Sequence, residues 1–187
     1  MPRLFVAIRI APEVADRLCK AQAELAPALS DARWIKRDSL HLTLKFLGQV
    51  DDAKVVAIQK AVAAAVAPLP RFMISCRGLG VFPDIRRPRV IWAGLEGAEL
   101  AKIAQAAEAA LAPLGFPREA REFKPHLTIG RWREGARGGD ALRGELERWR
   151  HHDFGASPVD DAVLFQSVLK RGGAEYTPLK IFPLRKD

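Results

Sequence analysis

Apolar and polar residues follow two periods along the chain, and each period predicts one kind of element. Alternating or continuous apolar runs predict strands over residues 3–10, 33–35, 40–47, 72–79, 89–95, 126–132, 162–170 and 176–182. Helical spacing predicts helices over residues 12–25, 53–66, 98–111 and 141–149. Hairpin-length turns join several of the strands, so we predict an α+β fold with antiparallel or mixed sheets rather than a wound parallel sheet.

One four-residue pattern occurs twice, as His41-Leu42-Thr43-Leu44 and as His126-Leu127-Thr128-Ile129. The chain has only four histidines and three threonines in 187 residues, so chance would place a Thr two positions after a His only about 0.06 times. In a strand, His and Thr then share one face and the aliphatic pair the other. Two such strands side by side would combine two imidazoles with two hydroxyl groups.

These groups suit acid–base chemistry at phosphorus. Imidazole titrates near neutral pH, so one copy can accept a proton while the other donates one. A Thr hydroxyl can donate a hydrogen bond to a phosphoryl or carbonyl oxygen. Histidines on opposite sides of a phosphorus atom would serve an in-line displacement. A single His-x-Thr is more often just a half-buried strand, but two matched copies favour a site.

The two motif histidines are separated by 126 − 41 = 85 positions, which is close to half of the chain. This spacing indicates an internal duplication in which each half supplies one motif. A chain of 187 residues fits one large domain or two small intertwined lobes.

Composition limits the kinds of binding partner and the cellular compartment that we expect. Thirty Lys and Arg residues against 22 Asp and Glu residues give a net charge of +8, which favours an anionic partner such as nucleic acid. Cys19 and Cys76 are widely spaced, so we expect reduced thiols in a cytoplasmic protein. The apolar run over residues 4–8 is too short for a signal peptide or a membrane span. No cluster has metal-ligand spacing and no nucleotide-binding loop is present, so we expect no metal, no cofactor and no use of ATP. We also expect a monomer.

The two motif strands, with Phe46-Leu47-Gly48 after the first and Lys124-Pro125 before the second, resemble the 2H phosphoesterase family. More narrowly, the chain is similar to the bacterial and archaeal RNA 2',3'-cyclic phosphodiesterases once described as 2'-5' RNA ligases. The similarity also includes residues 3–8, 80–83, 88–92, 164–170, 173, 176 and 182–184. It implies one domain over residues 1–187, with two lobes whose antiparallel sheets form a V-shaped cleft with helices outside. It further implies metal-independent hydrolysis of a 2',3'-cyclic phosphate to a 2'-phosphate, on RNA ends or small cyclic nucleotides.

The resemblance also implies a role for each site residue. His41 would protonate the leaving 3'-oxygen, and His126 would activate water. Thr43 and Thr128 would hold the non-bridging phosphate oxygens, with Arg131 near the phosphate. On strict alternation Arg131 faces away from His126, so it reaches the site only if Gly130 permits a bulge or the strand ends there.

Several further residues have two interpretations. Lys45 shares the parity of His41 and could extend a positive floor, or it could be solvated. Phe46 and Trp34 could stack a base or belong to the core. The loops over residues 86–89 and 131–143 could guide a phosphate backbone or be only solvated, and His151-His152 fits a surface or capping role.

Two functional alternatives remain at this level. A 2'-5' RNA ligase would run the same chemistry backwards, with a 5'-hydroxyl in place of water. A non-catalytic module would only bind an RNA end, a role that does not require a matched acid and base.

Overall fold

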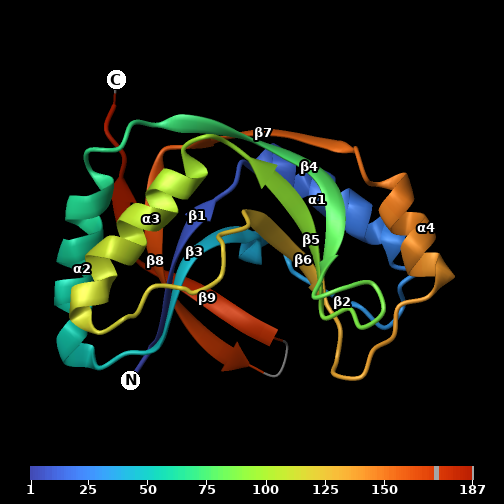
Figure 1. Ribbon diagram of the computed structural model, residues 1–187, viewed down its shortest axis with the longest axis horizontal. Coiled ribbons are helices and arrows are strands. Elements are labelled where there is room, and N and C mark those ends of the chain that lie inside the picture. Colours follow the sequence, from blue (N-terminus) through green and yellow to red (C-terminus); the bar gives the residue numbers. More distant parts are fainter. Residues whose placement is uncertain (171–172, 187) are drawn as a thin grey trace.

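A computed structural model of the chain describes residues 1–170 and 173–186, and its strands form two sheets (Figure 1). The four-stranded sheet has the order β3-β1-β8-β9 and consists of β1 (Arg3–Arg9), β3 (His41–Gln49), β8 (Asp161–Lys170) and β9 (Gly173–Pro183). The five-stranded sheet has the order β2-β6-β5-β4-β7 and consists of β2 (Arg33–Trp34), β4 (Phe72–Phe82), β5 (Val90–Glu96), β6 (His126–Arg131) and β7 (Asp153–Val159). Neighbouring strands within both sheets pair antiparallel, which confirms the α+β class and settles the choice between antiparallel and mixed sheets.

The helices lie on the outer sides of the two sheets (Figure 1). They are α1 (Pro12–Leu25), α2 (Asp52–Val66), α3 (Leu100–Leu111) and α4 (Asp140–Arg148). Helices α2 and α3 pack on the four-stranded sheet, whereas α1 packs on the five-stranded sheet. Pro12 occupies the first turn of α1, and the Asp51 side chain accepts a hydrogen bond from the Ala53 backbone at the start of α2. Not one helix in the described part of the chain is both long and apolar enough to cross a membrane.

The chain passes between the sheets more than once. The four-stranded sheet consists of β1 and β3 from the first part of the chain and β8 and β9 from its last part. The strands of the five-stranded sheet, β2 and β4 to β7, come from between β1 and β8. Helix α3 follows a strand of the five-stranded sheet but packs on the four-stranded sheet. Each sheet nevertheless contains one motif strand, β3 in one and β6 in the other.

Strand β7 has no counterpart among the strands that the sequence pattern predicts. The segment contains Gly155, Ser157 and Pro158, which are poor strand formers. In the structure it pairs with β4 at the edge of the five-stranded sheet. An edge strand tolerates proline because one side of its backbone needs no partner in the sheet. A smaller difference concerns β3, which was predicted to stop at Gly48 but continues through this residue to Gln49.

Two of the β-bulges in the motif strands involve residues of the motifs themselves. In β3, Val6 pairs with Lys45 while Ala7 pairs with Thr43, so Leu44 is an extra residue. In β6, Trp92 pairs with Thr128 while Ile91 pairs with Gly130, so Ile129 is the extra residue. An extra residue reverses the side-chain alternation beyond it. Both bulges therefore change which residues face the same way as the motif histidines.

Candidate active site

The two motif strands come into contact between the sheets (Figure 1). On each strand the aliphatic residues are buried in the core, with Leu42 1% exposed and Leu127 0% exposed. His41, Thr43, His126 and Thr128 are half-buried on the opposite faces. We call these faces the inner faces of the two sheets: Phe5, His41, Thr43 and Phe165 lie on one, and Phe82, Trp92, His126 and Thr128 on the other. The period-two alternation thus placed the four motif residues correctly.

Aromatic rings surround both motif histidines. The His41 ring centroid lies 4.8 Å from that of Phe5 and 5.0 Å from that of Tyr176, which meets it edge-on. On the other sheet the His126 centroid lies 5.1 Å from that of Phe82, also edge-on, and 6.5 Å from that of Trp92. The Trp92 ring lies over Gly80, where a Cβ atom would approach it to 2.2 Å, so this arrangement requires glycine. These rings restrict the orientation of each imidazole.

The sequence did not identify these aromatic residues as part of the site. Phe5 comes from β1 at the beginning of the chain, whereas Phe165 and Tyr176 come from the consecutive strands β8 and β9. Together with Ala7 and Val163 they form an apolar cluster that is separate from the main core. Strand parity would have grouped them with His41 only if the pairing of β1, β8 and β9 had been known.

Both imidazoles are held by the same backbone contact. His41 Nδ1 lies 2.8 Å from the Ser39 carbonyl oxygen, and His126 Nδ1 lies 2.7 Å from the Lys124 carbonyl oxygen. A carbonyl oxygen can only accept, so each Nδ1 must carry its proton and donate it. The remaining nitrogen, Nε2, is then a lone-pair acceptor in the neutral ring and a donor in the charged ring. Each histidine can therefore act as base or as acid through Nε2.

Electrostatics distinguish His41 from an ordinary surface histidine. Burial, opposed by the hydrogen bond to the Ser39 carbonyl and assisted by the positive charge of Arg131, lowers the pKa of His41 to about 4. His41 is therefore neutral at pH 7 in the free protein. A bound phosphodiester would bring a negative charge to this region, oppose the effect of Arg131 and favour the charged imidazole.

Arg131 is an exposed residue at the end of β6, and its charge acts on His41 of the other sheet. The extra residue Ile129 moves Arg131 to the inner face, so strict alternation gave the wrong direction for this side chain. Gly130 makes the local packing possible, since a Cβ atom there would meet Ile91 at 2.8 Å and the Trp34 ring at 3.1 Å. Trp34 packs against the core, as its second interpretation held.

We expect Arg131→Met to raise the pKa of His41. Arg131 disfavours a second positive charge nearby, so its removal makes the imidazolium easier to form. An NMR titration of the four histidine Cε1–H signals would measure this shift, with Arg133→Met as the control. An unchanged His41 titration in Arg131→Met would contradict the placement of Arg131 beside His41.

Lys45 and Phe46 lie on the opposite faces of the sheet from those that strict alternation predicts. The extra residue Leu44 turns Lys45 to the outer face, where it is 4% exposed, so it neither extends the floor of the site nor is solvated. Phe46 instead reaches the inner face and is 63% exposed, with its ring centroid 6.1 Å from that of Phe5. An exposed aromatic ring next to the His41 cluster is available for stacking.

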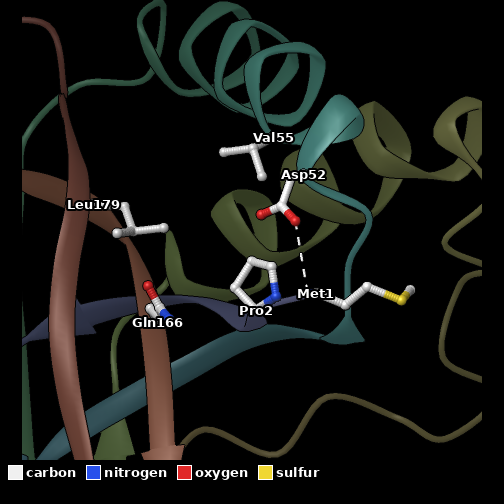
Figure 2. Close-up of a pocket in the computed structure, with 6 residues that line it drawn as sticks. All are labelled: Met1, Pro2, Asp52, Val55, Gln166 and Leu179. Atoms are coloured by element: carbon white, nitrogen blue, oxygen red, sulfur yellow. Dashed lines mark ion pairs between the residues drawn. The ribbon is translucent and has the colours of Figure 1, made fainter.

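Two surface hollows lie outside the motif residues. Figure 2 shows the first, of about 500 Å³, lined by Met1, Pro2, Asp52, Val55, Gln166 and Leu179. The second, of about 520 Å³, lies beside Phe46 and the segment over residues 115–119. Neither hollow contains a motif histidine, so the site is identified by its chemistry and not by the size of a hollow. Within residues 1–170 and 173–186, no three His, Cys, Asp or Glu side chains are grouped to hold a metal ion.

Comparison with known proteins agrees with this geometry. The model of the family described as LigT like Phosphoesterase matches residues 8–92 and 95–176, and each segment contains one motif. An RNA 2',3'-cyclic phosphodiesterase of Methanothermobacter thermautotrophicus is 32% identical over 183 residues, which are 97% of this chain and 98% of that protein. A protein of the same name from Archaeoglobus fulgidus is 34% identical over 96% of this chain and 99% of its own.

Solved structures are equally similar along the whole chain. A crystal structure from Thermus thermophilus superposes with a TM-score of 0.84 at 29% identity, covering 99% of both chains. The crystal structure of E. coli LigT complexed with 3'-AMP superposes with a TM-score of 0.79 at 27% identity, covering 98% of both chains. With its paired motifs, its two antiparallel sheets and these matches, the chain belongs to the LigT-like phosphoesterase family.

Proposed function

We propose that this chain hydrolyses 2',3'-cyclic phosphates at RNA ends to 2'-phosphomonoesters. The observation that carries this proposal is the pair of matched His-x-Thr units on two contacting strands, each with Nδ1 bonded to a backbone carbonyl. Support also comes from relatives named RNA 2',3'-cyclic phosphodiesterase that match over nearly the full length. Solved structures of LigT with 3'-AMP and with ATP indicate that nucleotides suit this fold.

In the proposed reaction, water attacks phosphorus while His126 Nε2 removes its proton. The bond from phosphorus to the 3'-oxygen breaks, and His41 Nε2 protonates that oxygen. A 2'-phosphate and a 3'-hydroxyl result, with His126 charged and His41 neutral, and exchange with solvent restores both. Thr43 and Thr128 donate to the non-bridging oxygens, and Arg131 stabilises their charge.

This assignment requires the substrate to change the protonation of His41. In the free protein the pKa of His41 is about 4, mainly because the ring is buried, so the imidazole is neutral at pH 7. The phosphate charge raises this pKa on binding, so the acid is formed in the complex with substrate. His41 then gives its proton to the leaving oxygen and is neutral again when the product departs.

We infer that RNA ends rather than free cyclic nucleotides are the preferred substrate. The net charge of +8 attracts a polyanion such as RNA. The exposed Phe46 ring, which could stack on a base, is separated from His41 by the ring of Phe5. Two arginine-containing loops, one after β4 and one after β6, lie side by side. The Gly138 backbone N–H of the second donates to the Arg86 carbonyl oxygen of the first at 3.2 Å. Arg89 of the first forms an ion pair with Glu134 of the second at 3.5 Å. These loops could contact the phosphates of an RNA strand.

We expect the protein to convert an oligoribonucleotide 2',3'-cyclic phosphate to its 2'-phosphate in the presence of EDTA. Two imidazoles are sufficient for both proton transfers, so chelation should leave the rate unchanged. Phosphorus NMR identifies the product isomer, and a nucleoside 2',3'-cyclic phosphate measured in parallel tests the preference for RNA.

Other outcomes would support other functions. Activity that is lost in EDTA and restored by a divalent ion would contradict the two-histidine mechanism. Tight binding of the RNA end without turnover would support the non-catalytic module. A joined product formed with an added 5'-hydroxyl oligonucleotide would show that ligation competes, although water at its bulk concentration favours hydrolysis.

A further inference from the structure

An ion cluster around the buried Lys45 connects the first motif strand to the segment that leads into the second. Lys45 is 4% exposed. Its Nζ atom lies 2.9 Å from Glu108 Oε1, 2.6 Å from the Pro117 carbonyl oxygen and 3.6 Å from Glu119 Oε1. Glu108 Oε2 also accepts hydrogen bonds from Lys45 Nζ and from the Glu119 backbone N–H, each at 3.1 Å.

The cluster joins three parts of the chain. Lys45 lies on β3, two residues after Thr43, and Glu108 lies on α3. Pro117 and Glu119 belong to the segment over residues 116–125, which contains no helix or strand and leads directly into His126. Within this segment the Lys124 carbonyl accepts from His126 Nδ1, and the Pro125 carbonyl accepts from the Leu95 backbone N–H at 3.2 Å. One end of the segment thus contacts the strand of His41, and the other end orients His126.

Stability alone does not explain why a lysine occupies position 45. Burial of an ion pair has a large desolvation cost, and an apolar residue of similar size is often as stable or more so. What an apolar residue cannot provide is a directional contact with a backbone carbonyl and two carboxylates. The Lys45 contacts fix residues 117–119 against β3 in one arrangement.

We propose that Lys45 is a positioning residue for catalysis, which sets His126 relative to His41 by holding residues 117–119. This inference rests on the proposed phosphodiesterase function. Without the lysine, residues 117–119 lose their contacts with β3, and the Lys124 carbonyl that orients His126 is anchored to a strand only through its neighbour Pro125. His41 is unaffected, because it is held by the Ser39 carbonyl just before its own strand.

The test compares three variants with the wild type on a 2',3'-cyclic phosphate. Lys45→Met should lower kcat by about 10- to 100-fold, as expected for a misplaced catalytic group, with little change in KM. Lys45→Met combined with Glu108→Gln removes the half-buried carboxylate that has lost its cation and should recover thermal stability while kcat stays low. Ile58→Ala, a fully buried site on α2, is a control for loss of stability and should retain kcat within about twofold at a temperature where it is folded.

A second readout shows whether Lys45 acts through His126. In a His126→Ala background, Lys45→Met should change kcat by no more than about twofold, since the group it positions is already absent. Recovery of both stability and kcat in the variant with Lys45→Met and Glu108→Gln would overturn the proposal, as would an additive effect in the His126→Ala background. If Lys45→Met alone does not fold, the kcat of the variant with both Lys45→Met and Glu108→Gln tests the proposal. Absence of activity in the wild type would instead contradict the proposed function.

Discussion

Alanine in place of either motif histidine is expected to lower kcat by about 10²–10⁴-fold, the range for loss of a general acid or base. Both imidazoles are fixed through Nδ1, which leaves Nε2 for proton transfer, and alanine removes that atom. Steady-state kinetics on a 2',3'-cyclic phosphate measures the effect. His151→Ala, the same substitution at an exposed position, should have near-normal activity and serves as the control.

The double variant His41→Ala with His126→Ala should fall well short of the product of the two single effects. The two histidines act in one reaction step, so either loss already removes most of the concerted proton transfer. Near-normal turnover in one single variant would exclude that residue from catalysis. Thermal unfolding of each variant shows whether a reduced rate reflects reduced folding, which matters most for His41 within its aromatic cluster.

A substrate with a much better leaving group should rescue His41→Ala but not His126→Ala. If His41 protonates the departing oxygen, an aryl phosphodiester whose phenolate departs without a proton no longer needs this residue. His126 would still be needed, because the attacking water must still lose its proton. The ratio of kcat between the aryl ester and the cyclic phosphate, measured for each variant, tests the two roles separately.

Rescue of His126→Ala in place of His41→Ala would show that the acid and the base are reversed. Such a result would leave the family and the pairing of the two strands untouched, because it concerns only which histidine begins the reaction charged. The low pKa of His41 in the free protein makes this experiment informative, since the acid role requires that the substrate change its protonation state.

The sequence predicted the motif residues well because their positions depend on local alternation alone. His41 with Thr43, and His126 with Thr128, needed only a period of two to share a face. Strict alternation gave the wrong face for Lys45, because Leu44 is an extra residue in β3. For Arg131 the bulge that its place in the site requires is present, at Ile129, but alternation alone could not predict it. A bulge depends on the pairing of neighbouring strands, and a single sequence does not contain that information in readable form.

Long-range pairing also explains the other differences. Phe5 and Tyr176 meet at His41 only because β1 and β9 both pair with β8. Strand β7 forms because β4 offers it an unpaired edge, although Gly155 and Pro158 argue against a strand locally. Element types with strong periodicity could thus be predicted, whereas the surroundings of the motif histidines followed from topology.

The construction of the four-stranded sheet has a consequence for synthesis of the protein on the ribosome. Strand β1 lies between β3, which follows it closely, and β8, which begins only at Asp161. Until the last strands have emerged, the His41 strand has only β1 beside it, and a two-stranded ribbon is marginally stable in water. A nascent chain that contains both motifs but not β8 and β9 therefore lacks Phe165 and Tyr176, two of the three rings beside His41. Activity should arise only once the end of the chain has been translated and has paired with its beginning.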